Sequence, residues 1–170
     1  MRRFLCFILA IFLPVLFSAC SGEKSEKTAQ DGEKMQCTLE IRCDTLLPHL
    51  DELSAGKAEL VPEDGVLLAK KEVDFSSGES VFDVFRRVLR EEKLHFEYVD
   101  TQIYNSVYIE GIGNLYEFDC GPQSGWMYTV NEVRPGLGCS AYLLSDGDEI
   151  CFSYTCDLGA DLGLEFHDEE

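Results

Sequence analysis

The chain has 170 residues, of which 32 are acidic and 14 are Lys or Arg, so its formal net charge is −18 at pH 7. Nucleic-acid binding depends on Lys and Arg side chains that neutralise phosphates, so this charge excludes nucleic acid as an expected partner. The same acidity disfavours adhesion of the protein's own surface to anionic lipid.

The first residues have the pattern of an export signal. Arg2 and Arg3 precede a run from Phe4 to Ala19 that is almost wholly apolar. That run is shorter than the roughly 20 residues that a membrane-spanning helix needs. A basic start followed by a short apolar run is typical of a secretory signal. We therefore expect residues 1–19 to be a signal peptide.

The end of this run, Leu16-Phe17-Ser18-Ala19-Cys20, resembles the lipobox of bacterial lipoproteins, in which small residues precede the cysteine that is lipidated. The alternative is an ordinary cleaved signal followed by a chance cysteine. With two or more acyl chains, palmitate among them, Cys20 would anchor the protein stably to a membrane. Residues 20–36 are polar and rich in Ser, Glu, Lys and Gly, which predicts a flexible tether. We expect a lipid-anchored protein on the extracellular face of the cell membrane.

Six cysteines remain in the single domain expected over residues 37–170, once Cys6 in the signal and Cys20 are set aside. An even number of cysteines in an exported chain predicts disulfides. Zinc is disfavoured because the chain has no C-x-x-C pattern and its histidines lack ligand spacing, so we expect no metal site. These histidines are His49, His95 and His167.

Cys120 and Cys139 bracket one predicted hairpin, so we expect them to form a disulfide. The other four thiols lie in two apolar segments with similar spacing, at 37–43 and 149–156. Their pairing stays open. Parallel strands would pair Cys37 with Cys151 and Cys43 with Cys156, and antiparallel strands would pair Cys37 with Cys156 and Cys43 with Cys151. A third alternative is that some of these thiols stay free.

The first half of the domain predicts two strands with an irregular excursion between them. Residues 38–42 alternate between polar and apolar side chains, as a half-buried strand does. Residues 44–69 contain two prolines and an Asp-Gly turn, which favours irregular structure with a short helical turn near 46–53. A second short strand is expected at 71–75.

One amphipathic helix is predicted from about residue 78 to 93. It follows Ser76-Ser77-Gly78-Glu79, which has the pattern of a capping box. The apolar residues after it recur at i, i+3, i+4, i+7 and i+8, which places them on one stripe of a helix. They are Val81, Val84, Phe85, Val88 and Leu89.

Beyond the helix the chain predicts strands and turns only. Asp146-Gly147 is a hairpin signal between the last two expected strands. Two strands, one helix and a further run of strands, with the first and last strands adjacent, predict an α+β fold. We expect a β-grasp-like mixed sheet with one amphipathic helix packed on it. The strands expected after the helix are 95–99, 106–112, 116–119, 125–131, 141–144 and 149–155.

Three separated motifs occur in one order: Gly78-Glu79-Ser80, the segment SGWMYTVN at 124–131, and the segment 146–154 that begins Asp-Gly-Asp and ends in Tyr. Together they resemble the transcobalamin-like C-terminal domain found on secreted proteins of Gram-positive bacteria. The resemblance covers roughly residues 37–160 and implies a β-grasp-type fold. In the animal cobalamin carriers, the related domain closes over a corrinoid held against a second, helical domain, for which the present residues show no counterpart.

Trp126 is the sole tryptophan, and strand parity places it on one face with Tyr128 and Val130. In one interpretation Trp126 and Tyr128 fill the core. In the other they form an aromatic platform, with Asn131 close by and the loop 132–138 beside it, because Trp and Tyr offer broad area with few rotamers. We hypothesise that Trp126 lies at the rim of the sheet with part of its ring available. The ligand would be a corrinoid such as cobalamin or another planar small molecule.

No catalytic arrangement is evident, so the sequence predicts no enzyme. No histidine is placed to activate Ser124, and the Asp146–Glu149 segment lacks the oxygen spacing of a calcium loop. Two functions compete. The chain could be a cell-surface lipoprotein presenting a ligand-binding domain. It could instead be a non-catalytic module that docks onto a second surface protein or an extracellular polymer.

Overall fold

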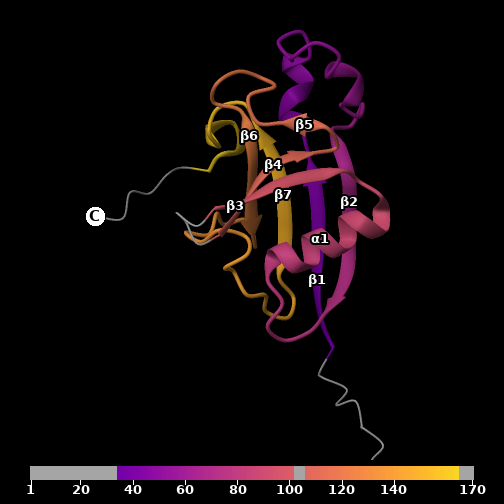
Figure 1. Ribbon diagram of the computed structural model, residues 1–170, viewed down its shortest axis with the longest axis vertical. Helices are drawn as coiled ribbons and strands as arrows, with labels where there is room; N and C mark the ends of the chain where they lie inside the picture. The colour runs from indigo at the N-terminus through magenta and orange to yellow at the C-terminus, as the bar shows by residue number, and fades with distance from the viewer. Residues whose placement is uncertain (1–33, 102–105, 165–170) are drawn as a thin grey trace, which may run out of the picture. The chain divides into compact units, whose positions relative to one another are not determined.

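The structure is a computed structural model that describes residues 34–101 and 106–164 (Figure 1). The expected signal peptide, the lipid site at Cys20 and the greater part of the expected tether lie outside these residues. The first strand begins at Met35, two residues before the expected start of the domain. In the described part of the chain, no helix is both long and apolar enough to cross a membrane.

The main sheet brings the first and last strands of the domain together at its centre. Strand β1 (Met35–Arg42) pairs in parallel with β7 (Glu149–Thr155) and antiparallel with β2 (Val66–Phe75). Strand β6 (Gly125–Val130) pairs antiparallel with β7 on its other side. The order β2-β1-β7-β6 is therefore that of a mixed sheet, which confirms the predicted fold class.

Helix α1 (Val81–Glu92) begins three residues after its expected start near 78, and its capping box is formed by Ser80 and Asp83 instead of the predicted segment at 76–79. The Ser80 side chain accepts a hydrogen bond from the backbone N–H of Asp83, and the Asp83 carboxylate accepts one from the backbone N–H of Ser80. These bonds satisfy backbone donors that a helix N-terminus leaves without partners. The helix ends at Lys93, which adopts a left-handed conformation with φ of 58°.

A second, smaller sheet covers the same face as the helix. It consists of β3 (Phe96–Thr101), β4 (Ser106–Ile112) and β5 (Leu115–Tyr116), all antiparallel. Figure 1 shows α1, β3 and β4 on one side of the strands β1 and β7. The core thus lies between two layers, the main sheet on one side and α1 with the small sheet on the other.

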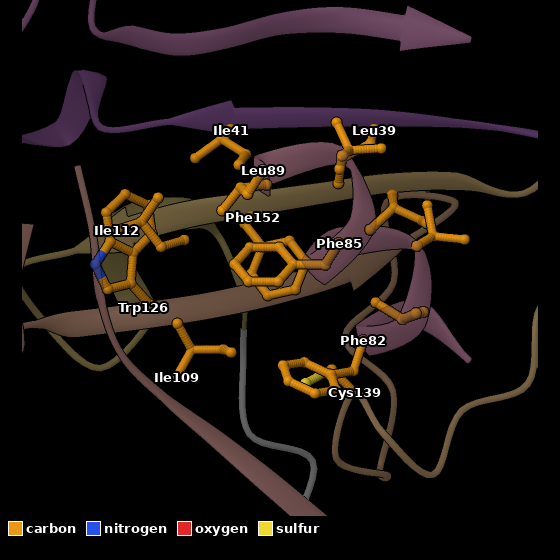
Figure 2. Close-up of a cluster of buried hydrophobic side chains, with 14 of the residues drawn as sticks. Leu39, Ile41, Phe82, Phe85, Leu89, Ile109, Ile112, Trp126, Cys139 and Phe152 are labelled. Atoms are coloured by element: carbon orange, nitrogen blue, oxygen red, sulfur yellow. The ribbon is translucent and has the colours of Figure 1, made fainter. Parts of the chain in front are cut away.

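The apolar stripe of α1 packs directly on the central strands. The Phe85 ring lies 4.5 Å from the Phe152 ring between centroids, and both side chains are almost fully buried. Leu39 and Ile41 of β1 lie beside this pair, and Trp126 lies at the far end of the same cluster (Figure 2). The positions that the helical and strand periodicities assign to the interior are therefore interior.

The irregular excursion before β2 contains two short 3-10 helices, η1 (Asp44–His49) and η2 (Ala58–Leu60). The first corresponds to the expected helical turn. Strand β2 begins earlier than expected, at Val66 rather than near residue 71. A third 3-10 helix, η3 (Ala160–Leu162), follows β7.

One expected strand, residues 141–144, does not form. This segment runs past the start of α1 instead, where the carbonyl of Tyr142 accepts a hydrogen bond from the N–H of Val81. The N–H of Leu144 in turn donates to the carbonyl of Glu79. The turn at Asp146-Gly147 is present, with φ of 84° at the glycine, but it does not connect a hairpin.

The predicted Cys120–Cys139 disulfide is not formed in this structure, in which all six cysteines of the domain are free thiols. The reason is the missing strand, because without the hairpin the chain carries Cys139 away to β4. There the Cys139 thiol lies 3.7 Å from the carbonyl of Val107. The Cys120 Sγ instead lies 3.4 Å from the Sγ of Cys156.

The two pairing schemes for the other four thiols also fail. Strands β1 and β7 are parallel, but their register places Cys151 beside Glu40, three residues from Cys37. Strand parity directs Cys37 into the core and Cys151 to the opposite face. The Cys43 thiol is buried and free, so neither the Cys37–Cys151 and Cys43–Cys156 scheme nor its antiparallel alternative is present.

Candidate ligand-binding groove

A groove of about 580 Å³ lies between β4, β6 and the loop over residues 134–141. Its volume falls in the range of roughly 300–1,000 Å³ that is usual for small-molecule sites. Most of its lining is apolar or aromatic. The principal lining side chains are Val107, Tyr108, Ile109, Trp126, Met127, Tyr128, Arg134, Pro135, Leu137, Cys139, Ala141 and Phe152.

Trp126 lies at the inner end of this groove and is mainly a core residue. Only 7% of it is exposed, and its indole N–H donates to the carbonyl of Leu115 at 2.9 Å. Its ring meets that of Tyr154 edge to face, with centroids 5.2 Å apart. The structure favours the core interpretation, because the ring that was expected at the rim lies within the buried hydrophobic cluster (Figure 2), although Trp126 also lines the groove.

Tyr128, two residues along the same face of β6, is half-buried and ties the strand to the loop. Its ring stacks on Phe152 at 5.6 Å between centroids. Its hydroxyl donates to the carbonyl of Leu137 at 2.6 Å. Burial raises the pKa of Tyr128 above its ordinary value, so this hydroxyl stays a donor beyond the pH at which an exposed tyrosine ionises. Tyr128 therefore holds one wall of the groove in place.

The loop that forms this wall is fixed by a close approach to β4. A side-chain carbon at Gly138 would lie 1.7 Å from the hydroxyl oxygen of Ser106, so only glycine fits there. Next to it, the hydroxyl of Ser140 accepts a hydrogen bond from the N–H of Val107 at 2.9 Å. The wall is thus preformed by contacts between segments about 30 residues apart in the sequence.

Two side chains expose apolar surface at the mouth of the groove, Tyr108 at 42% and Leu137 at 56%. The Tyr108 hydroxyl donates to Glu117 at 2.5 Å, and burial together with this carboxylate raises the pKa of Tyr108. Neither residue is predicted as a site from the sequence. The one available signal is the segment Pro-Gly-Leu-Gly at 135–138, which places a large apolar side chain in a loop of turn formers.

Asn131, the third expected ligand-binding residue, does not line the groove. Its side-chain amide donates to Asp148 at 2.9 Å, and its side-chain oxygen accepts from the backbone N–H of Glu149 at 2.9 Å. Its φ of 53° is one that Asn tolerates better than most residues. Asn131 therefore joins the end of β6 to the start of β7, which is a structural role.

No metal centre accompanies the groove in the described part of the chain, where no group of three or more His, Cys, Asp or Glu side chains is placed to hold a metal ion. The Asp148 carboxylate, one of the acidic groups considered for calcium, bonds to Asn131 and to the backbone N–H of Ser145. Its oxygens serve the turn between residues 144 and 149.

Comparisons with known proteins place this fold. Residues 78–156, just under half of the chain, match a family model described as a domain of unknown function (DUF4430). A search of curated proteins found no relative of the chain. The family model includes α1, β4, β6 and β7, so it covers the groove and the helix that packs beside it.

Several solved structures are similar to the chain, among them a haptocorrin complex and a bacterial protein. The crystal structure of haptocorrin in complex with cobinamide aligns with a TM-score of 0.55 and 11% identity, over 74% of this chain and 26% of haptocorrin. The chain thus spans about a quarter of that protein. A proposed metal-binding protein from Ruminococcus gnavus ATCC 29149 aligns with a TM-score of 0.40 and 14% identity, over 71% of this chain and 96% of that one. The fold resembles that of a transcobalamin-family protein, and no catalytic family matches.

Proposed function

We propose that the chain is a cell-surface lipoprotein whose domain binds a planar, largely apolar small molecule, of the corrinoid class, in the groove beside β6. The observation that carries this proposal is the groove itself. It is apolar, preformed and about 580 Å³ in volume, in a fold shared with part of a protein solved with cobinamide. A groove held by Gly138 and Tyr128 before the ligand arrives lowers the entropy lost on binding.

The shape and charge of the site narrow the ligand class. The groove is open along one side, so it would cover one face or edge of a ring system larger than itself. The net charge of −18 disfavours anionic ligands, whereas the charged side chain among the groove's lining residues is the cation Arg134. A neutral macrocycle, whose apolar edge lies between Tyr108 and Leu137, fits both observations.

The expected lipid at Cys20 would hold this groove at the cell surface. A tether of about 15 polar residues has an average end-to-end distance of about 20 Å, which holds the groove near the membrane but free to turn. Cys20→Ser is expected to release the protein from the membrane into the medium. Equal retention of the two forms would contradict the anchor.

Titration of the full chain with cobinamide, followed by corrin absorbance, tests the groove. Leu137→Ser removes an apolar side chain from its mouth and should weaken binding about tenfold or more, since a buried Leu contributes about 1.5–3 kcal/mol. Leu143→Ser is the matched control, because Leu143 is 62% exposed and lies outside the groove. Absence of binding, or equal weakening by both variants, would overturn the proposal.

A non-catalytic interaction module is the second candidate, and one feature favours it. Strand β6 is the edge of the main sheet, and edge strands accept an added strand from a partner. If cobinamide fails to bind, protection of the β6 amides from hydrogen exchange by a co-purified surface protein would favour this alternative.

A further inference from the structure

The Sγ atoms of Cys120 and Cys156 lie 3.4 Å apart, although 36 residues separate them in the sequence. The six cysteines of the domain all lie in the part of the chain that the structure describes, and among them no other two thiols are in hydrogen-bond contact. A disulfide needs its sulfurs about 2.05 Å apart, so these two atoms have to approach by roughly 1.4 Å.

The backbone at both cysteines is held in place around this contact. The N–H of Cys120 donates to the Ser124 hydroxyl at 3.0 Å, within a tight turn that leads into β6. The N–H of Cys156, immediately after β7, donates to the Asp161 carboxylate at 2.7 Å. The two turns therefore present the thiols to each other in a defined position.

We propose that Cys120 and Cys156 form an intramolecular disulfide when the domain meets an oxidant of the disulfide class, such as oxidised glutathione. The Cys156 thiolate, on the more exposed of the two residues, attacks one sulfur of the reagent and releases one small thiol. The Cys120 thiolate then attacks the Cys156 sulfur of the mixed disulfide and releases the second. Two protein thiols become one disulfide and one reagent disulfide becomes two thiols.

The position of this bond means that it would hold two strands of the main sheet together. Gly125 pairs with Thr155 at the adjacent ends of β6 and β7, so the bond would fasten the two strands just beyond their last ladder pair. The ring that it closes, from residue 120 to 156, contains β6, β7 and the loop that forms the groove wall. The proposal does not depend on what the groove binds.

The surroundings of Cys156 set the pH at which the bond forms. Burial, together with Cys120, Asp161 and Glu52 nearby, raises the pKa of Cys156 to about 12. Because the thiolate is the attacking species, uncatalysed bond formation should be slow at pH 7 and should accelerate as the pH rises. A thiol-disulfide exchange catalyst would remove much of this delay.

Non-reducing peptide mapping of the full chain, reduced and then incubated with oxidised glutathione, tests the proposal. A cross-linked peptide pair containing Cys120 and Cys156 is expected, and the unfolding temperature should rise by about 10 °C relative to the reduced form. A Cys120–Cys139 peptide pair would overturn the proposal. So would free Cys120 and Cys156 in a sample whose more exposed thiols have reacted.

Two variants distinguish a loss of the cross-link from a loss of the fold. Cys120→Ala should leave Cys156 as a stable glutathione adduct, because the second thiol is missing. Cys139→Ala, which alters an equally buried thiol, should leave the cross-link intact. Loss of the cross-link in the Cys139 variant, in a sample whose circular dichroism matches the parent, would contradict the assignment.

Discussion

Two rows of side chains cross the same face of the main sheet, and only one of them is fully buried from solvent, which makes it the sealed row. Leu39, Ile150 and Val130 occupy neighbouring positions on β1, β7 and β6, and all three are at most 3% exposed. In the next row, Ile41 and Phe152 are equally buried, but Tyr128 of β6 is only half-buried. Both rows belong to the same sheet, so the difference in burial arises from the elements that cover each row.

Over the central strands the cover is α1, whose Phe85 ring packs on Phe152. Over β6 the cover is β4 and a glycine-rich loop, which contacts β4 at Ser106 and β6 at Tyr128 and leaves a groove between these contacts. A helix presents a continuous stripe of large side chains, whereas a loop of Pro and Gly does not. Similar aromatic residues therefore serve as core in one place and as a candidate binding surface in the other.

Trp126 precedes Tyr128 on the same face of β6 but is buried like the sealed row, and Trp126→Ala should have the largest effect. Trp126 is 7% exposed and its N–H is bonded to Leu115, so its loss should lower the free energy of unfolding by about 3–5 kcal/mol. Urea denaturation followed by circular dichroism measures the change. A loss below about 1 kcal/mol would place Trp126 with the groove, and easy quenching of its fluorescence by acrylamide would agree with that result.

The sheet and the helix could be predicted because their signals are local. The apolar stripe from Val81 to Leu89 has the period of a helix, although the residue that caps it is Ser80 and not the predicted capping box at 76–79. Strand parity puts Trp126 and Val130 on the buried face. The matched cysteine spacing in β1 and β7 suggested that these strands are neighbours, and they are, although in a register that pairs no cysteines.

The sequence indicates one side of the groove, the aromatic residues of β6 with the loop over residues 132–138, but not the other side, because β4 joins them only in three dimensions. Residues 141–144 are apolar enough for a strand, but their backbone serves the start of α1, where Tyr142 bonds to Val81. That contact draws the preceding loop across β4, where Gly138 rests on Ser106. No sequence pattern reports a contact of this range, so Leu137 is recognised as a groove residue only in the structure.

Ser80→Ala weakens the cover of the sealed side and should have an intermediate effect. Losing the cap hydrogen bond to the N–H of Asp83 should cost about 1 kcal/mol of unfolding free energy. The exposed Ser77, to which the structure assigns no cap bond, provides the control substitution Ser77→Ala. Equal losses in the two variants would show that α1 does not depend on its capping box.

The same cap predicts a response to acid. Hydrogen bonds from the Ser80 hydroxyl and the Ser80 N–H, with Arg86 and Arg87 nearby, lower the pKa of Asp83 below its ordinary value of 3.8. A lowered pKa stabilises the fold above pH 3.8, and this contribution disappears as the pH falls through the folded-state value. The stability gap between the parent and Ser80→Ala should therefore narrow below about pH 4, as thermal unfolding across a pH series would show.

Tyr128→Phe tests the open side and should have the smallest effect on stability. It removes only the hydroxyl that donates to the carbonyl of Leu137, and because Leu137 is exposed, water can replace that donor. The expected loss is about 1 kcal/mol or less. The loop over residues 134–141 should nevertheless exchange its amide hydrogens faster, because the bond that holds it to β6 is gone, while the amides of α1 keep the exchange rates of the parent. Cobinamide affinity should fall with the loop's protection. Equal acceleration of exchange in α1 would mean that Tyr128 supports the whole core. The groove could then not be loosened without also loosening the sealed row beside it.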